Sequence, residues 1–179
     1  MENRQKESYD KKRYLYLKNE RIKELPPDPI KFLTPVQRAY IAGIIDGEGS
    51  IYARNERKTI YPTLAIHMTD RSVIEWIQNL VHGQKVWELQ RRDSVRYKRL
   101  TKKQYLFRIC GKRLQILCKS ILPYLIVKKT HAIIVNEWPI DVRKWNRTIP
   151  DNIQKTRKLL GDKLTQANGN SYKIKHGII

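Results

Sequence analysis

The sequence has few cysteines and no long hydrophobic run, and each shortage excludes a class of protein. Only two cysteines, Cys110 and Cys118, occur in 179 residues, and one pair at this spacing predicts neither a disulfide framework nor a zinc site. We interpret both as small buried hydrophobic residues. The longest apolar stretches, 40–45 and 121–127, are much shorter than the ~18 residues of a membrane-spanning helix. The N-terminal sequence lacks the apolar segment of a secretory signal, so we expect an intracellular, reducing compartment.

Acidic residues are also scarce. Seventeen Asp and Glu stand against 37 Lys and Arg, which leaves a net charge of +20 at pH 7. A charge of this size predicts a polyanionic partner. Hydrophobic residues nevertheless make up 40% of the chain, with four Trp and ten Tyr, and this content is too high for a disordered basic tail. We therefore expect a folded basic protein of about one domain.

Changes in composition predict a central domain between two basic extensions. Residues 1–33 are charged and end in the Pro-rich turn 25–29, which indicates an N-terminal extension followed by a linker. The central domain is expected over 34–140. The remaining residues, 141–179, form a second basic extension with a possible helix over 153–164, suited to holding flanking phosphates.

Hydrophobic periodicity in the central part predicts an α+β fold. Thr34 begins a capping-box pattern with Pro at the first helical position, and Gly47 and Gly49 end the helix that follows. Alternating residues from 51 to 68 then predict a hairpin. The later elements are expected to be a helix from Asp70 to Gly83, strands over 85–92 and 104–110, a helix from Gly111 to Leu122 and a helix over 128–138. The order α-β-β-α-β-β-α predicts one antiparallel sheet of two hairpins, covered by helices on one face.

The uncovered face of that sheet is the candidate binding surface. A two-stranded ribbon fits the DNA major groove, and two basic hairpins beside a charge of +20 favour a DNA-binding saddle over an ordinary solvated face. The candidate DNA-contacting residues are Ser50, Tyr52, Arg54, Tyr61, Thr63 and His67 in the first hairpin, and Arg91, Arg92, Gln104 and Arg108 in the second.

The peptide 40–50, YIAGIIDGEGS, holds the most informative pattern. Small residues at 42–43 on an apolar helix permit close approach of a second helix. Asp46 and Glu48 follow near the helix C-terminus, where the helix dipole disfavours negative charge. A divalent cation bound by Glu48 and the Gly47 carbonyl would compensate, and Mg²⁺ prefers such oxygen ligands. From charge alone, simple solvation of both acids is the stronger interpretation.

Residues 41–49, IAGIIDGEG, resemble the signature motif of the LAGLIDADG homing endonucleases, with Glu in place of the final Asp. The resemblance extends through the element order from 34 to about 138. One copy of the motif is visible, as in the single-motif branch, whose members act as homodimers with the motif helices packed at the two-fold axis. The resemblance implies dimer contacts by Ile41, Ala42, Gly43 and Asp46.

The resemblance also implies roles at the candidate catalytic site. Glu48 matches the metal-binding acid, the Gly47 carbonyl matches the backbone metal ligand, and Asp46 matches a helix-capping acid. Asp70 stands where the family often has Gln, so it either acts in catalysis and binds metal directly or caps the next helix. Lys128 has the spacing of the family's catalytic-pocket lysine, and a surface charge at a helix start is the alternative.

The function implied by the resemblance is that of a site-specific homing endonuclease. Such an enzyme uses Mg²⁺ to cut both strands of a long, partly palindromic DNA target as a homodimer, and leaves short 3′ overhangs. The alternatives are an intron RNA maturase or a non-cleaving DNA-binding regulator of the same fold, because a basic sheet also binds structured RNA. A basic ribosome-associated module is a more distant alternative. The intact acids of the motif favour cleavage.

Overall fold

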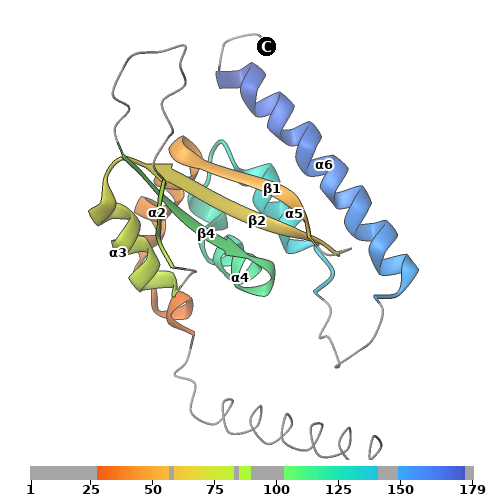
Figure 1. Cartoon of the computed structure of the whole chain (residues 1–179), viewed down its shortest axis with the longest axis horizontal. Coiled ribbons are helices and arrows are strands. Elements are labelled where there is room, and N and C mark those ends of the chain that lie inside the picture. Colours follow the sequence, from red (N-terminus) through yellow and green to blue (C-terminus); the bar gives the residue numbers. More distant parts are fainter. Residues whose placement is uncertain (1–27, 57–58, 83–84, 90–102, 141–148, 176–179) are drawn as a thin grey trace, which may run out of the picture.

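The computed structural model of the chain describes residues 28–56, 59–82, 85–89, 103–140 and 149–175, with side chains described as far as 169. A four-stranded antiparallel sheet of order β1-β2-β4-β3 lies over a layer of helices (Figure 1). The elements, in chain order, are η1 (Pro29–Phe32), α2 (Pro35–Glu48), β1 (Gly49–Glu56), β2 (Thr59–Met68), α3 (Arg71–Val81), β3 (Trp87–Leu89), β4 (Gln104–Cys110), α4 (Gly111–Ile121), η2 (Leu122–Tyr124), α5 (Lys129–Asn136) and α6 (Asp151–Lys175). The predicted α+β fold and element order are confirmed.

Helix α2 begins and ends for reasons visible in the sequence. The Thr34 hydroxyl accepts a hydrogen bond from the Gln37 amide at 3.2 Å, and the Gln37 side chain accepts one from the Thr34 amide at 2.9 Å. This capping box satisfies two amides at the helix start. At the other end, a Cβ atom on Gly49 would lie 2.5 Å from the Ile45 carbonyl oxygen. Only glycine therefore allows the chain to pass directly from α2 into β1.

Strand register decides which side chains enter the core. Leu64 of β2 lies between Ile51 of β1 and Ile109 of β4, and all three are buried with Ile66 and Phe107. Opposed residues of antiparallel strands share a face, so this face of the sheet packs against the helices. Burial of each such side chain contributes about 1.5–3 kcal/mol. The other face of the sheet carries mostly polar and aromatic residues, together with the buried side chains of Ala65 and Leu106.

The packed core extends beyond the predicted 34–140 at both ends. Ile30 of η1 is buried in the same hydrophobic cluster as Leu160 and Leu164 of α6. Helix α6 spans 25 residues, more than the predicted 153–164, and contacts β1, β2 and α5. It runs beside β1 in Figure 1. The C-terminal helix is therefore part of the domain, while 1–27 and 141–148 lie outside the described residues.

The second hairpin is described only near its base. Strand β3 contains three residues, and Trp87, Glu88 and Leu89 pair with Leu106, Tyr105 and Gln104 of β4. The predicted contact residues Arg91 and Arg92 lie outside the described residues. Helix α3 ends at Val81, with His82 in the left-handed region at a φ of 44°. Within the described residues, no helix is both long and apolar enough to cross a membrane.

Candidate active site and nucleic-acid interface

The Asp46 carboxylate joins the end of α2 to the start of α5. It accepts hydrogen bonds from the backbone amides of Ile126 at 2.7 Å and of Lys128 at 2.8 Å. These two amides supply the positive partner that an acid near a helix C-terminus needs. Asp46 therefore has a structural role at the start of α5, and it holds the backbone of Lys128 against the helix that ends at Glu48.

Glu48, the last residue of α2, is exposed, and so is Gly47 before it. A Cβ atom on Gly47 would meet nothing within 4 Å, so the backbone there is open to a ligand. Together the two residues offer a carboxylate and a carbonyl, both hard oxygen donors. In the part of the chain that the structure describes, no three His, Cys, Asp or Glu side chains are grouped so that they could hold a metal ion.

Lys128 is half-buried at the first turn of α5 and acts electrostatically on His131 of the same helix. His131 is 1% exposed, and its Nε2 lies 3.0 Å from Oδ1 of Asn168 in α6. The Asn168 amide nitrogen in turn donates to the Ile51 carbonyl of β1 at 3.0 Å. Burial, and then the Lys128 charge, lower the pKa of His131. These contacts tie α5, α6 and β1 together next to the candidate site.

Sequence reasoning did not identify the His131–Asn168 pair. The two residues are separated by 37 positions and lie on different helices. Neither belongs to a motif, and a buried histidine has no local signature. Only a signal that reports long-range contacts would have found this pair.

Asp70 caps helix α3. Its Oδ1 accepts hydrogen bonds from the Ser72 amide at 2.9 Å, the Ser72 hydroxyl at 2.6 Å and the Val73 amide at 3.2 Å. The Ser72 hydroxyl and the Val73 amide are the main causes of a lowered pKa of Asp70. Of the two roles that the sequence left open, this geometry is that of a helix N-cap.

The proposed dimer-contact residues divide between the two sides of α2. Ile41 and Ala42 are fully buried in the core of their own protomer, so their side chains cannot contact a second copy, and this part of the prediction is corrected. The periodicity of the helix turns both residues toward the sheet. Gly43 faces outward, and a Cβ atom there would meet nothing within 4 Å. Asp46 is half-buried and held by the amides before α5.

The side of α2 that faces away from the core carries exposed apolar side chains and glycines with no neighbouring atoms. Val36 is 79% exposed and Tyr40 is 52% exposed, and they share a helical face with Gly43 and Gly47. We call Val36, Tyr40, Gly43 and Gly47 the outer stripe of α2. Ile126 is 86% exposed. It lies near the C-terminal end of this stripe, because the Ile126 amide donates a hydrogen bond to the Asp46 carboxylate.

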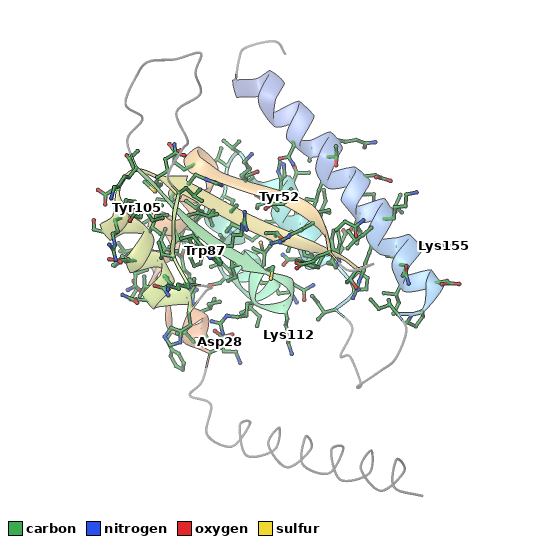
Figure 2. The ribbon with its side chains drawn as sticks, in the orientation of Figure 1. Asp28, Tyr52, Trp87, Tyr105, Lys112 and Lys155 are labelled. Carbon is green, nitrogen blue, oxygen red and sulfur yellow. The ribbon has the colours of Figure 1, made fainter. Side chains whose placement is uncertain are left out.

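The strand register gathers the predicted DNA-contacting residues on the free face of the sheet. Tyr52 opposes Thr63, and Ala65 opposes Arg108, on the side away from Leu64. Figure 2 labels Tyr52 on this sheet (Figure 2). The predicted residues that share the face are Ser50, Tyr52, Arg54, Tyr61, Thr63, His67, Gln104 and Arg108. Thr63 is only 1% exposed, so it lies beneath the surface and is not accessible for a base contact.

On the free face of the sheet, two sets of side-chain contacts hold charged groups in place. Glu56 pairs with Arg54 at 3.5 Å and accepts a hydrogen bond from the Tyr61 hydroxyl. Burial, followed by this hydrogen bond, raises the pKa of Tyr61. On β4, the Arg108 guanidinium lies 5.8 Å from the ring centroid of Trp87, a cation–π distance. Trp87 was not among the predicted residues, because its face in the second hairpin was not determined by the sequence.

The fold is found among proteins of known structure. No protein-family model matches the chain, and no curated protein sequence matches it. The homing endonuclease I-CvuI, solved in complex with its target in the presence of 2 mM Ca, is similar with a TM-score of 0.57 and 22% identity, over 74% of this chain and 82% of that chain. The archaeal intron-encoded homing endonuclease I-Vdi141I, complexed with DNA, is similar with a TM-score of 0.50 and 19% identity, over 74% of this chain and 84% of that chain. The chain therefore has the fold of the LAGLIDADG homing endonucleases.

Proposed function

We propose that the protein is a site-specific DNA endonuclease that acts as a homodimer and uses Mg²⁺ to cut both strands of a long, partly palindromic target. The observation that carries this proposal is the placement of an exposed carboxylate, Glu48, at the end of a helix with an open outer side. That position adjoins the start of β1, which leads onto the free polar face of the sheet. The two similar structures named above are of homing endonucleases with DNA, which supports the same function here.

The outer stripe of α2 supports the homodimer part of this proposal. Gly43 and Gly47 leave room for a second backbone to approach closely, and Val36 and Tyr40 offer apolar surface on the N-terminal side of that contact. A two-fold axis beside this stripe would place two copies of Glu48 close together. The second protomer would then supply the oxygen ligands that one protomer lacks.

The residues at the end of α2 fit a magnesium ion, since the Glu48 carboxylate and the Gly47 carbonyl are hard oxygen donors and both residues are exposed. When bound, Mg²⁺ supplies Lewis-acid polarisation of the scissile phosphate and activation of the attacking water. Asp46 positions the backbone of Lys128 near these ligands. The Lys128 ammonium would then stabilise negative charge that develops on the phosphate.

The free face supplies the target contacts. Tyr52, Arg54, His67 and Arg108 present aromatic and cationic groups on adjacent strands, and a strand ribbon of this kind enters the major groove. Phosphate contacts set the position of a protein on DNA, while base-edge contacts give specificity. Two protomers related by a two-fold axis would read two half-sites of similar sequence.

The test is cleavage of a plasmid library in the presence of Mg²⁺. We expect discrete double-strand cuts by the wild-type protein. The Glu48→Gln variant should retain DNA binding and lose both cutting and nicking, because it removes the charged ligand but little volume. Glu137→Gln, the same change at the exposed far end of α5, is the matched control and should cut normally.

Two results would contradict the proposal. Cutting by Glu48→Gln at the wild-type rate would remove this carboxylate from the reaction. A wild-type protein that cuts no member of the library but binds structured intron RNA and promotes its splicing would be a maturase of the same fold.

A further inference from the structure

A groove of about 360 Å³ lies where η1, α2 and α3 meet. Its apolar lining is formed by Pro29, Phe32, Leu33 and Leu80, and its polar lining by Gln37, Asn79 and His82. We call it the η1–α3 groove. Figure 1 shows η1 beside α3. Gln37 is at the first turn of α2 and Glu48 is its last residue, so at about 1.5 Å per residue the groove is roughly 16 Å along the helix from the candidate ligand.

The side chain of Phe32 leaves apolar surface uncovered in this groove. It is 68% exposed, although Ile30 and Leu33 on either side of it along the chain are buried. Exposed apolar surface that lines a groove is typical of an interaction site. A partner with apolar side chains would therefore fit here.

The described part of the chain begins at the edge of the groove, at Asp28, which Figure 2 labels. Asp28 Oδ1 accepts a hydrogen bond from the Ile30 amide at 3.1 Å and lies 3.7 Å from the Arg113 guanidinium. The same guanidinium donates to the Val81 carbonyl at the end of α3. The next residue, Pro29, lines the groove. The point at which the preceding residues join the domain is thus fixed beside the groove.

The sequence before this point combines charge with an apolar pattern. Residues 14–25, YLYLKNERIKEL, lie outside the described residues, and we call them the arm. Leu15, Ile22 and Leu25 are separated by seven and three positions, a spacing typical of segments that lay one apolar side into a groove.

The arm is tethered within reach of the groove. Leu25 is three residues from Asp28, and a chain spans at most about 3.6 Å per residue, so the two Cα atoms are no more than about 11 Å apart. A short tether gives the arm an effective concentration on the order of millimolar at the groove. A separate protein would have to compete with this.

We propose that the arm of the same chain occupies the η1–α3 groove, with its apolar side chains against Phe32, Leu33 and Leu80. The arm then covers the apolar surface that the described residues leave exposed. Because η1, α2 and α3 belong to the helical layer, the arm and its charges are held on the opposite side of the sheet from the free face. This inference goes beyond the proposed function and does not depend on it.

The test measures how fast a thiol placed in the groove reacts with a maleimide in the full chain. Asn79→Cys places the thiol at an exposed lining residue, and Asn152→Cys, at an exposed asparagine of α6, is the matched control. Both are made on a Cys110→Ala background, because Cys110 is only half-buried. Cys118 is 1% exposed and reports any opening of the core.

Two sets of changes in the arm are then compared. The apolar-arm variant carries Leu15→Ser, Leu17→Ser and Ile22→Ser. The charged-arm variant carries Lys18→Ser, Arg21→Ser and Lys23→Ser, and it alters the same segment while keeping its apolar side chains.

We expect the apolar-arm variant to raise the labelling rate at Asn79→Cys at least about 10-fold, since a groove occupied for about nine-tenths of the time slows labelling about 10-fold when the arm exchanges rapidly. The charged-arm variant should keep the rate of the unchanged arm. The rate at Asn152→Cys should be the same with all three arms, and Cys118 should stay unlabelled throughout.

Three outcomes would overturn the inference. Equal rates at Asn79→Cys with the unchanged and the apolar-arm sequences would show that the arm does not cover the groove. Protection that is lost on dilution would assign the groove to a second copy of the chain. Protection that appears only when duplex DNA is added would assign the cover to DNA.

The labelling needs neither DNA nor metal, so it separates this inference from the proposed function. A chain that cuts no DNA but labels as expected retains the arm in its groove and loses the endonuclease proposal. A chain that cuts its target but labels at equal rates loses only the arm contact.

Discussion

At the residue scale, acids with similar sequence contexts have different surroundings. Asp46 and Glu48 lie two positions apart, yet the first accepts two backbone hydrogen bonds and the second is exposed. Asp70 accepts three hydrogen bonds from the first turn of α3. A carboxylate with several backbone donors has a structural role, whereas an exposed one is available to a cation.

Asp70 should therefore affect stability rather than cutting. Asp70→Asn keeps a good N-cap and should retain the melting temperature and the cutting activity, whereas Asp70→Ala should melt at a lower temperature. Because hydrogen bonds lower the pKa of Asp70 from 3.8, its charged form stabilises the fold above that value, and this contribution is lost as pH falls through the lower folded-state pKa. The difference in melting temperature between wild type and Asp70→Ala should shrink below about pH 4. Loss of cutting by Asp70→Asn, with normal melting, would instead indicate a catalytic role.

His131 should make stability depend on pH in a higher range. Its pKa is lowered from 6.5 by burial and by Lys128, so the unfolded chain takes up the proton more readily than the folded one. The contribution of neutral His131 is full above pH 6.5 and decreases as pH falls below it. His131→Asn should flatten the decline in denaturant midpoint between about pH 6.5 and 5. The exposed residue His82 offers a control, and an equal flattening by His82→Asn would contradict this assignment.

At the element scale, α6 links β1, the strand that follows Glu48, to α5, the helix that follows Lys128. Asn168 bonds both His131, one turn from Lys128, and the Ile51 carbonyl, three residues after Glu48. Gly161 packs closely as well, since a Cβ atom there would lie 3.1 Å from the Ala53 side chain. A helix outside the predicted central domain thus supports the strand and the helix that carry the candidate groups.

Asn168→Ala should lower the free energy of unfolding by about 1 to 3 kcal/mol, because it leaves the buried Ile51 carbonyl and His131 without this partner. Denaturant titration gives the change. Asn152→Ala, at an exposed position near the start of the same helix, is the control and should change stability by no more than about 0.5 kcal/mol. Equal stabilities of the two variants would show that the Asn168 bridge does not fasten α6.

At the scale of the whole molecule, a strongly basic chain with an open helix face fits a two-fold assembly on a polyanion. The charge of +20 per chain opposes association of two protomers through repulsion. Bound DNA would offset this repulsion, so we expect dimers to be more stable on duplex than in free solution.

Gly43→Leu tests the proposed interface. A side chain at this position meets open space in the protomer, and replacing a helical glycine favours the helix by up to about 1 kcal/mol. The variant should therefore melt no lower than wild type but dimerise at least about 10-fold more weakly, because the helices can no longer approach closely. Sedimentation at several concentrations, with and without duplex, measures the change. Gly169→Leu, at an equally open position on α6, should dimerise as wild type does, and an equal loss in both variants would contradict the interface.

The sequence by itself determined the features that depend on neighbours along the chain. The capping box at Thr34, the alternation that turns Tyr52 and Arg54 away from the core, and the glycine that links α2 to β1 follow from local hydrogen bonding and strand periodicity. These short-range rules were sufficient for the element order and for the identity of the free face. Glu48 became the candidate ligand only through the resemblance of residues 41–49 to the family motif.

Only the tertiary structure decided which groups meet across the fold. It turned Ile41 and Ala42 inward, placed Thr63 beneath the surface, and joined His131 to Asn168. The physical reason is that such contacts depend on how elements pack, which is set by the summed burial of many side chains and not by the spacing of a few residues. Helical periodicity predicts that α2 has two sides, but the packing of the sheet and of α4 decides which side is left open for a partner.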